Sequence, residues 1–195
     1  MEADPEDVWW LFGVIAGDGH VGRYFVEISD MYKENLEVVA GVIKKLGYKA
    51  VITRDRRENR YRLWVNSKAF ADLVRGIGTP IPRIEFGRIA FVQGLYDAEG
   101  YVEFWKPRKI IRINFANKDE EIIRLVIRTL KGIGIEKPYI RYSMRCYRVQ
   151  IYRKVDVLTY IKNIGFRYPS KQRRLLSLFF LRFLFLLRFS FSTNL

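Results

Sequence analysis

The apolar and polar residues of this chain follow the same pattern twice. Residues 10–19 read WLFGVIAGDG and residues 91–100 read FVQGLYDAEG, so each segment is an apolar run that contains small residues and ends on an acid and a glycine. Apolar runs that stop at a glycine are typical of buried helices. The pattern predicts helices over residues 9–18 and 89–99.

The segments that follow these two helices also recur. An alternating segment, typical of a strand with one polar face, precedes a helical pattern, and a second alternating segment and a second helical pattern come next. The predicted strands span 24–29, 61–66, 111–116 and 147–152, and the further helices span 33–46, 70–78, 118–133 and 157–165. We interpret each copy as an αββαββα unit, of which the segments above are the most clearly patterned parts. This unit, present twice, predicts an α+β fold.

A segment rich in proline and glycine separates the two copies. Residues 79–87 read TPIPRIEFG, which is the composition of a connector. We therefore expect a first half over 1–78, a linker over 79–87 and a second half over 88–195 that includes a C-terminal helix. A pseudo-twofold axis would relate the halves.

The composition narrows the class of partner and of chemistry. The 195 residues carry 35 Lys and Arg against 21 Asp and Glu, and this net charge of +14 favours a polyanionic partner. Hydrophobic residues at 49% exclude intrinsic disorder. A single cysteine, Cys146, and a single histidine, His20, exclude a disulfide framework, a cysteine zinc site and a histidine-rich metal site. Any metal chemistry must rest on carboxylates.

Two segments bear on localisation. The acidic N-terminus lacks the features of a secretory signal, which predicts an intracellular protein of the cytoplasm or nucleoid. Residues 175–191 are nearly apolar, but Arg182 and Arg188 would each cost about 2.5–3.5 kcal/mol near the centre of a bilayer. We therefore expect a helix packed on the core with these arginines directed outward, and no membrane partner.

The candidate chemistry lies at the ends of the two repeated helices. Asp18 and Glu99 would occupy the last turn, beside the negative end of the helix dipole, which costs about 0.3–1 kcal/mol each. One acid of this kind before a terminal glycine is most simply a solvated side chain on a buried helix. Two such acids in matched contexts favour a shared site.

Small residues four positions apart allow the two helices to pack closely. Gly13 and Gly17 lie in the first copy, and Gly94 and Ala98 lie in the second. Side-by-side packing would bring the two acids together at one end, where carboxylates repel each other unless a cation lies between them. Mg²⁺ suits a site made of oxygen ligands.

Residues 11–19 and 92–100 align without gaps, and they resemble the signature helices of the LAGLIDADG homing endonucleases in the monomeric, intron-encoded form with two motifs per chain. The resemblance covers nearly the whole chain, including the αββαββα order. The first copy departs from the family by carrying Ala16 where an acid is common. The resemblance implies two antiparallel sheets that form a DNA-binding saddle, with the signature helices packed at the centre.

By resemblance, the protein is a metal-dependent DNA endonuclease that cuts one strand per half and leaves 3′ overhangs. The implied metal site contains Asp18, Glu99, Gly17 and Ala98. Mg²⁺ is the implied cofactor, with Mn²⁺ as a substitute and Ca²⁺ supporting binding without cleavage.

The family also places polar or basic groups near the reacting phosphates. At the end of the second strand of each copy these are Asp30 or Met31 and Asn117–Lys118, and before the terminal helix it is Lys171. Lys118 and Lys171 are therefore candidate catalytic residues, with simple phosphate contact as the alternative.

The outward faces of the predicted strands would read the DNA. Alternation places polar side chains on one face of each strand, where arginine suits guanine and asparagine or glutamine suits adenine. The candidate DNA-binding residues in or near these strands are Glu27, Ser29, Arg62, Trp64, Asn66, Arg112, Asn114, Arg148, Gln150 and Tyr152. Arg54, Arg56, Arg141 and Arg145 lie in segments that look like hairpin turns or adjacent strands, where they would hold phosphate. The alternative for each arginine is a solvated surface charge, and for Trp64 and Tyr152 it is packing on the sheet.

Three functions are compatible with these features. The first is a site-specific endonuclease that acts on double-stranded DNA as a monomer. The second is an RNA maturase that binds its own intron RNA, and the third is a DNA-binding regulator without catalysis. Loss of the motif acids would favour the second or the third, and both acids are present.

Overall fold

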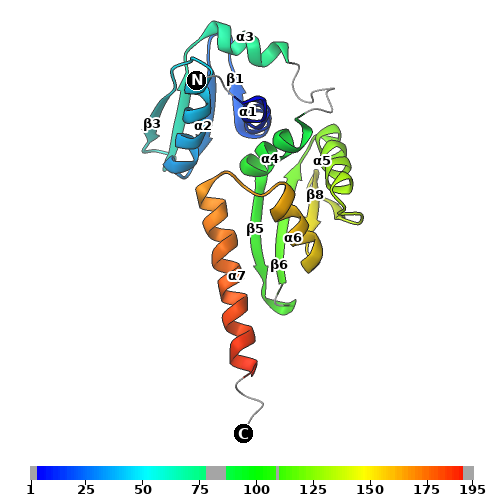
Figure 1. Cartoon of the computed structure of the whole chain (residues 1–195). Coiled ribbons are helices and arrows are strands. Elements are labelled where there is room, and N and C mark those ends of the chain that lie inside the picture. Colours follow the sequence, from blue (N-terminus) through cyan, green and yellow to red (C-terminus); the bar gives the residue numbers. More distant parts are fainter. Residues whose placement is uncertain (1–3, 78–86, 109, 191–195) are drawn as a thin grey trace.

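Two four-stranded antiparallel sheets and seven α-helices make up the residues that this computed structural model describes, which are 4–77, 87–108 and 110–190 (Figure 1). The first half contains α1 (Pro5–Asp18), β1 (Gly19–Val21), β2 (Val26–Asp30), α2 (Lys33–Lys45), β3 (Val51–Asp55), β4 (Arg60–Val65) and α3 (Lys68–Gly76). The second contains α4 (Arg88–Glu99), β5 (Gly100–Trp105), a 3₁₀ turn (Lys106–Arg108), β6 (Ile110–Asn117), α5 (Glu120–Gly132), β7 (Tyr139–Ser143), β8 (Cys146–Ile151), α6 (Lys154–Asn163) and α7 (Pro169–Ser190).

This element order confirms the predicted αββαββα repeat and the α+β class. The helices and the central strands lie within a few residues of their predicted bounds. The edge strands β1, β3, β5 and β7 were not located one by one from the sequence. Edge strands β3 and β7 are mostly exposed on both faces, and β1 has only three residues, so alternation of apolar residues is weak in them.

The two sheets have the same topology. Their strand orders are β1-β2-β4-β3 and β5-β6-β8-β7. In the first sheet Asp30 lies opposite Tyr61, and in the second Asn117 lies opposite Tyr147. These matching registers give each residue of one sheet a counterpart in the other.

Helices cover one face of each sheet and leave the other face open. Helix α2 packs on the first sheet, and α5 and α6 pack on the second. The covered faces carry the apolar residues of the central strands, which are 0–2% exposed: Val26, Ile28, Leu63, Val65, Ile111, Ile113, Phe115, Val149 and Ile151. The hydrophobic core thus fixes which side chains of each strand face outward.

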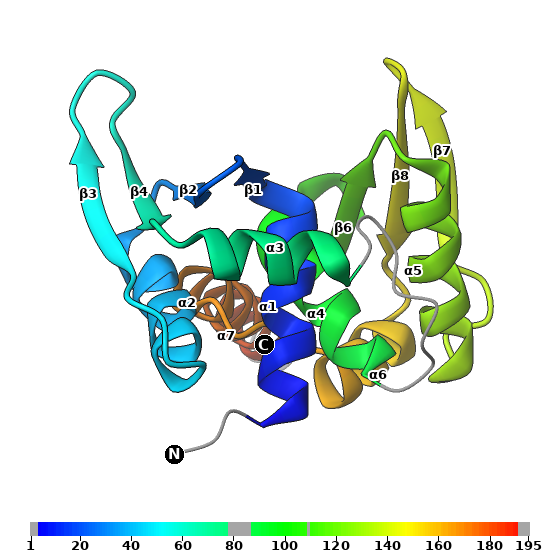
Figure 2. The same cartoon turned by 90° about the horizontal axis from the view of Figure 1, so that it is seen from above.

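Helices α1 and α4 pack against each other at the centre, between the two sheets (Figure 2). A Cβ atom on Gly13 would lie well within 3.0 Å of the Phe91 carbonyl oxygen, and one on Gly94 would lie equally close to the Trp10 carbonyl oxygen. Each glycine therefore lies against the backbone of the opposite helix. This contact confirms the close packing that the small residues predicted.

The first turns of helix α7 pack on the rest of the molecule. Leu175 and Leu178 are buried, and Leu176 is 58% exposed. Figure 1 shows the later turns of the helix continuing past the two halves. The side chains after residue 179 lie outside the described residues, so the expected packing of residues 175–191 on the core stays a prediction for that part. A straight helix of 22 residues is about 33 Å long and extends past the elements that its first turns contact.

Some expectations lie outside the described residues. These are the linker over 79–86 and the outward direction of the Arg182 and Arg188 side chains. Among the described helices, none combines the length and the apolar character needed to cross a bilayer.

We predict that Gly94→Ala destabilises the fold by about 2–3 kcal/mol, because the added methyl group would overlap the backbone of α1. Gly41→Ala in α2 is the matched control, since a Cβ there has no neighbouring atom within 4 Å. That change should leave the stability unchanged or raise it by about 0.5–1 kcal/mol. Chemical denaturation measures both values, and equal effects of the two variants would contradict the close contact.

Candidate active site at the ends of the paired helices

Asp18 and Glu99 are the last residues of α1 and α4. Each helix ends there because the next residue, Gly19 or Gly100, takes an extended conformation and begins the first strand of its sheet. A Cβ atom on Gly17 would lie 3.4 Å from Cγ of Glu99, so the ends of the two helices meet. The predicted meeting of one acid from each half at a common end is therefore present.

The surroundings of both acids favour a bound proton or cation. Burial raises the pKa of Glu99 to about 7, and the nearby Asp18 carboxylate adds to the rise. Partial loss of hydration raises the pKa of Asp18 as well, and the positive charge of Lys171 opposes that shift. The two carboxylates thus repel each other where the helix ends meet, with Glu99 partly buried and Asp18 exposed.

Asn117 holds the carboxylate of Glu99. Its Nδ2 donates to Oε2 of Glu99 at 2.6 Å, and its Oδ1 accepts from the backbone N–H of Asp119 at 2.7 Å. The adjoining Lys118 is exposed. The sequence placed the pair Asn117–Lys118 at this strand end, and within that pair it is the asparagine that reaches the acid.

Asp30 occupies the equivalent position in the first half. Its carboxylate accepts from the backbone N–H of Tyr32 at 2.6 Å and from Nδ2 of Asn35 at 3.1 Å. Asp30 cannot donate to Asp18 as Asn117 donates to Glu99, and its charge instead raises the pKa of Asp18. The two halves of the site are therefore chemically different.

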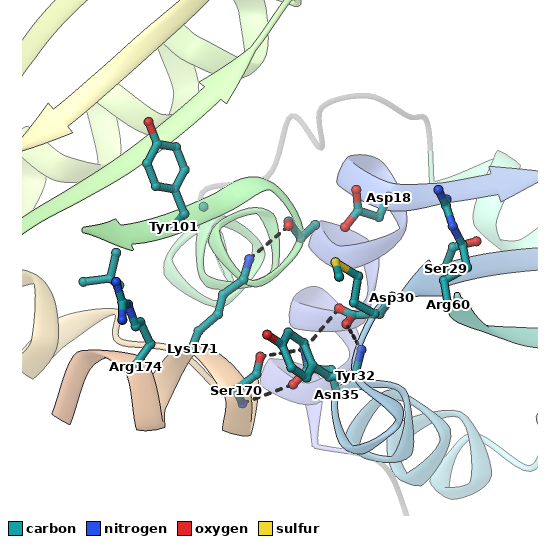
Figure 3. Close-up of a pocket in the computed structure, with 14 residues that line it drawn as sticks. Asp18, Ser29, Asp30, Tyr32, Asn35, Arg60, Tyr101, Ser170, Lys171 and Arg174 are labelled. Carbon is teal, nitrogen blue, oxygen red and sulfur yellow. Dashed lines mark hydrogen bonds between the residues drawn. The ribbon is translucent and has the colours of Figure 1, made fainter. Parts of the chain in front are cut away.

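A cavity of about 570 Å³ lies between the halves beside Asp18 (Figure 3). Asp18 and Asp30 line it from the first half, Tyr101 lines it from the second, and Lys171 and Arg174 line it from α7. Negative and positive side chains from three parts of the chain thus face one space.

Lys171 binds the end of α4. Its Nζ donates to the carbonyl oxygens of Tyr96 and Ala98, each at 3.0 Å, and also to that of Asp97. Burial lowers the pKa of Lys171, and the surrounding carboxylates, Asp97 first, oppose this shift. The lysine thus donates to carbonyl groups of the last turn, where Tyr96 also accepts from the N–H of Gly100, and it offsets the negative end of the helix dipole.

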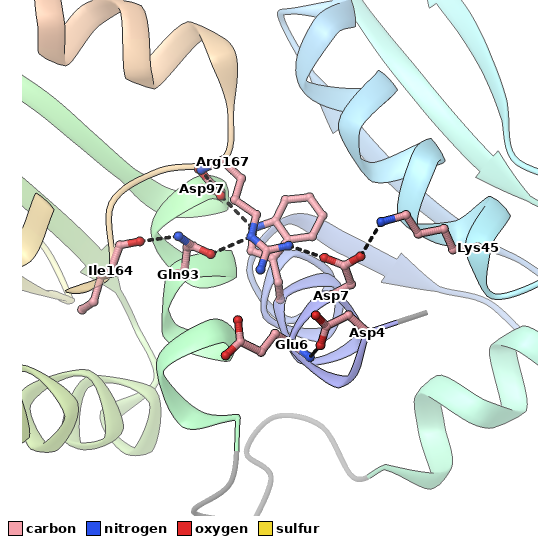
Figure 4. A network of polar contacts seen from close by, with 9 residues as sticks. Asp4, Glu6, Asp7, Lys45, Gln93, Asp97, Ile164 and Arg167 are labelled. Carbon is pink, nitrogen blue, oxygen red and sulfur yellow. Dashed lines mark hydrogen bonds and ion pairs between the residues drawn. The ribbon is translucent and has the colours of Figure 1, made fainter. Parts of the chain in front are cut away.

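Asp97 anchors the segment that leads into α7 (Figure 4). Its side chain is fully buried, and it accepts from Nε1 of Trp10 at 2.8 Å and from the backbone N–H groups of Arg167 and Tyr168 at 3.0 Å. The sequence reading did not assign this residue, although an acid inside an apolar motif was a visible signal. Its counterpart in α1 is Ala16.

The Arg167 side chain extends the same anchor to the first half. Its Nε donates to Gln93 at 2.7 Å and its Nη1 donates to Asp7 at 2.6 Å, while Asp7 also pairs with Lys45 at 2.7 Å. Figure 4 shows these groups in one continuous network. The segment before Lys171 is thus bound to α1, α4 and, through Asp7, to α2.

The outward face of the second sheet carries most of its predicted DNA-binding residues. Arg112, Arg141, Arg148, Gln150 and Tyr152 line a hollow of about 550 Å³. The turn after β7 exposes Arg145.

Asn114 was also predicted for this face and is wrong as an accessible contact. Its side chain is 0% exposed and accepts from Gln150 at 2.7 Å. Its strand is central, and Tyr101 and Gln150 flank it on the neighbouring strands, so the shorter side chain is covered.

Three candidates of the first sheet take positions that bear on their predicted roles. Arg54 is exposed on β3, the strand adjacent to β4, where it lies opposite Tyr61 and therefore shares the helix-covered side of the sheet, not the side of Arg62. Asn66 is exposed but follows the end of β4. Trp64 packs against Phe25, with 5.4 Å between ring centroids.

The remaining candidates of the first sheet lie near their predicted places. Ser29 lines the cavity beside Asp18, and Arg56 is exposed in the turn after β3. Glu27 is on the outward face, where it pairs with Arg62 at 2.9 Å.

The groups available for a metal ion are oxygen atoms. They are the carboxylates of Asp18 and Glu99 and the backbone carbonyls of Gly17 and Ala98 beside them, of which the Ala98 carbonyl already accepts from Lys171 at 3.0 Å. A set of oxygen donors with two carboxylates and an unsatisfied electrostatic repulsion suits a hard divalent cation such as Mg²⁺. The residues present thus fit the predicted ion.

Comparison with known proteins gives one consistent match. A family model described as a LAGLIDADG-like domain matches residues 5–78 and 87–165. The homing endonuclease I-ApeI of Aeropyrum pernix is 25% identical over an alignment of 195 residues that covers 88% of this chain and 86% of that protein.

Two solved structures have the same fold. I-DmoI, a homing endonuclease of Desulfurococcus mucosus, matches in its complex with DNA and Mn with a TM-score of 0.63 and 24% identity, over 82% of this chain and 96% of that one. The N-terminal LAGLIDADG domain of WhiA matches with a TM-score of 0.64 and 16% identity, over 83% of this chain and 82% of that one.

We predict a pH-dependent stability difference between the wild type and Glu99→Gln without divalent ions. The pKa of Glu99 is about 7 in the folded protein against an ordinary value of 4.5. The folded state therefore holds more protons than the unfolded state between these values, and stability falls as the pH rises through them. The glutamine variant lacks this loss, so its advantage in unfolding midpoint should grow from about pH 5 to about pH 8.

Thermal unfolding in the presence of a chelator measures this difference. Glu136→Gln, on an exposed loop, controls for the change in net charge. A constant offset between Glu99→Gln and the wild type across the range would contradict the raised pKa.

We also predict that Asp97→Asn lowers the free energy of unfolding by about 2–3 kcal/mol, because its amide NH₂ would face buried N–H donors. Asp72→Asn makes the same chemical change at an exposed pair with Lys68 and Arg75, where a much smaller loss is expected because solvent screens the pair. Denaturant titration compares the two variants. A similar small loss in both would show that the buried anchor does not hold the segment before α7.

Proposed function

The chain belongs to the LAGLIDADG-like family, and from that premise we propose that it is a site-specific double-strand DNA endonuclease of the homing type. The similarity to the homing endonucleases I-ApeI and I-DmoI supports this proposal. The net charge of +14 supports a nucleic-acid partner. We propose that it acts as a monomer, because one chain already contains both halves of the site.

The observation that carries the proposal is the meeting of Asp18 and Glu99 at one end of the helix pair. A structural role does not account for this arrangement. Each acid lies at the unfavourable end of its helix, and the charge of Asp18 raises the pKa of Glu99. Two acids at a common end allow one cut on each strand, and each half provides one acid.

Asp18 and Glu99 would hold the divalent ions, together with the carbonyl groups of Gly17 and Ala98 and phosphate oxygens of the DNA. Such ions supply an activated water and stabilise charge on the phosphate and on the leaving oxygen. We propose Mg²⁺ as the working ion, Mn²⁺ as a substitute and Ca²⁺ as an ion that supports binding without cleavage. The I-DmoI complexes with Mn and with Ca support divalent ions of this kind.

The chain's own residues position the acids. Asn117 orients Glu99 through its 2.6 Å hydrogen bond, and Lys171 holds the carbonyl groups at the end of α4. The outward faces of the two sheets would bind the DNA on either side of the acids. One cut per half, on opposite strands, would leave the 3′ overhangs.

We predict that a randomised duplex library is cut by the wild type with Mg²⁺ at one long site. Asp18→Asn or Glu99→Gln should reduce cleavage of one strand or both by about 100-fold or more, while DNA binding with Ca²⁺ is retained. Sequencing of the cut ends measures the site and the overhang. Asp72→Asn on the exposed surface of α3 is the matched control and should cut normally.

The other outcomes separate the alternatives. Binding of duplex DNA without any cleavage would overturn the endonuclease and favour a DNA-binding regulator. Binding of intron RNA without binding of duplex DNA would favour a maturase. Unchanged cleavage by both single variants would overturn the roles given to the two acids.

A further inference from the structure

Arg62 and Arg148 occupy equivalent positions in the two sheets. Arg62 lies opposite Ser29, one residue from the pair Asp30 and Tyr61. Arg148 lies opposite Ala116, one residue from the pair Asn117 and Tyr147. Both arginines are on the outward face of their sheet, so the repeat provides a natural comparison of one side chain in two settings.

The charge of Arg62 is neutralised within the first sheet. Its guanidinium pairs with Glu27 at 2.9 Å, Asp55 at 2.8 Å and Glu58 at 3.3 Å. Arg60, the other arginine on this face, also pairs with Glu58, at 2.9 Å. Three carboxylates thus surround two arginines, and an approaching phosphate would meet negative charge beside each of them.

The charge of Arg148 has no such neutralisation. Its cross-strand neighbour is Arg141, and within the described residues no carboxylate lies at ion-pair distance from either side chain. Like charges placed directly opposite each other on neighbouring strands destabilise a sheet. Folding does not explain this pair, whereas an anion bound over it would remove the repulsion.

Aromatic rings add to the second face. The guanidinium of Arg112 lies 3.6 Å from the ring centroid of Trp105, and that of Arg108 lies 5.1 Å from it. Stacking on an aromatic ring fixes a guanidinium without removing its positive charge. Glu103 is the one carboxylate that lines this hollow, and it reaches Arg112 only at 3.5 Å.

We propose that the two sheets contribute unequally to DNA binding: the second sheet supplies most of the electrostatic attraction to the phosphates, and the carboxylates of the first sheet withhold Arg62 from phosphates in general. This inference rests on the proposed function, because it takes duplex DNA as the partner. Arg62 then contacts DNA only where a correctly placed group replaces its carboxylate partners.

The salt dependence of binding tests this division directly. Each phosphate contact made by an arginine contributes about 0.9 to the slope of log K against log salt concentration. We expect Arg148→Ala to reduce the slope by about 1, and Arg62→Ala to reduce it by less than half as much. Fluorescence anisotropy with a labelled random-sequence duplex measures the slope from about 50 to 200 mM salt.

A second variant keeps the test valid if Arg62→Ala folds poorly. Glu27→Gln/Glu58→Gln removes two of the carboxylates and leaves Arg62 in place. We expect the slope of this variant to increase by up to about 1, because Arg62 becomes available to phosphates. Glu103→Gln makes the same kind of change on the second sheet and should have a smaller effect, since its pair with Arg112 is long.

The results distinguish the inference from the proposed function. A larger loss of slope in Arg148→Ala and a gain in Glu27→Gln/Glu58→Gln would support the unequal division. Equal losses for the two arginine variants, or no gain in the carboxylate variant, would overturn it while leaving the endonuclease intact. Absence of binding by the wild type at the lowest salt concentration would overturn both.

Discussion

The close contact between the backbones of α1 and α4 is the constraint on which the rest of the molecule depends. Gly13 and Gly94 let each helix touch the main chain of the other, and a side chain at either position would separate them. Because each helix continues directly into the first strand of its sheet, this contact also sets where the two sheets lie. It brings Asp18 and Glu99 together although they belong to different halves.

The site departs from twofold symmetry at the ends of the paired helices. Asp97 in α4 holds the segment that leads into α7, and the equivalent position in α1 is Ala16. The anchored segment then places Lys171 on the end of α4. Hydrogen bonds from several N–H groups to a buried carboxylate are costly to break. The segment is therefore held rigidly, and it supports Lys171.

The polar environments of Asp18 and Glu99 also differ. Asn117 and Asp30 end equivalent strands, yet one donates to Glu99 and the other adds negative charge near Asp18. The outward faces of the sheets also differ, with carboxylates around Arg62 and a second arginine beside Arg148. A repeat that is symmetric in its backbone is therefore asymmetric in its electrostatics.

The repeat, the α+β class and the pair of acids can be predicted from the chain alone, because apolar periodicity and terminal glycines are signals within single helices and strands. Residues such as Gly94 also indicate close helix packing. Which polar groups meet depends on the folded molecule. Asn114 is covered, Arg54 faces the other side of its sheet, and Asn117 rather than Lys118 reaches Glu99. These outcomes depend on strand register and on contacts between distant segments, and a linear pattern does not carry that information.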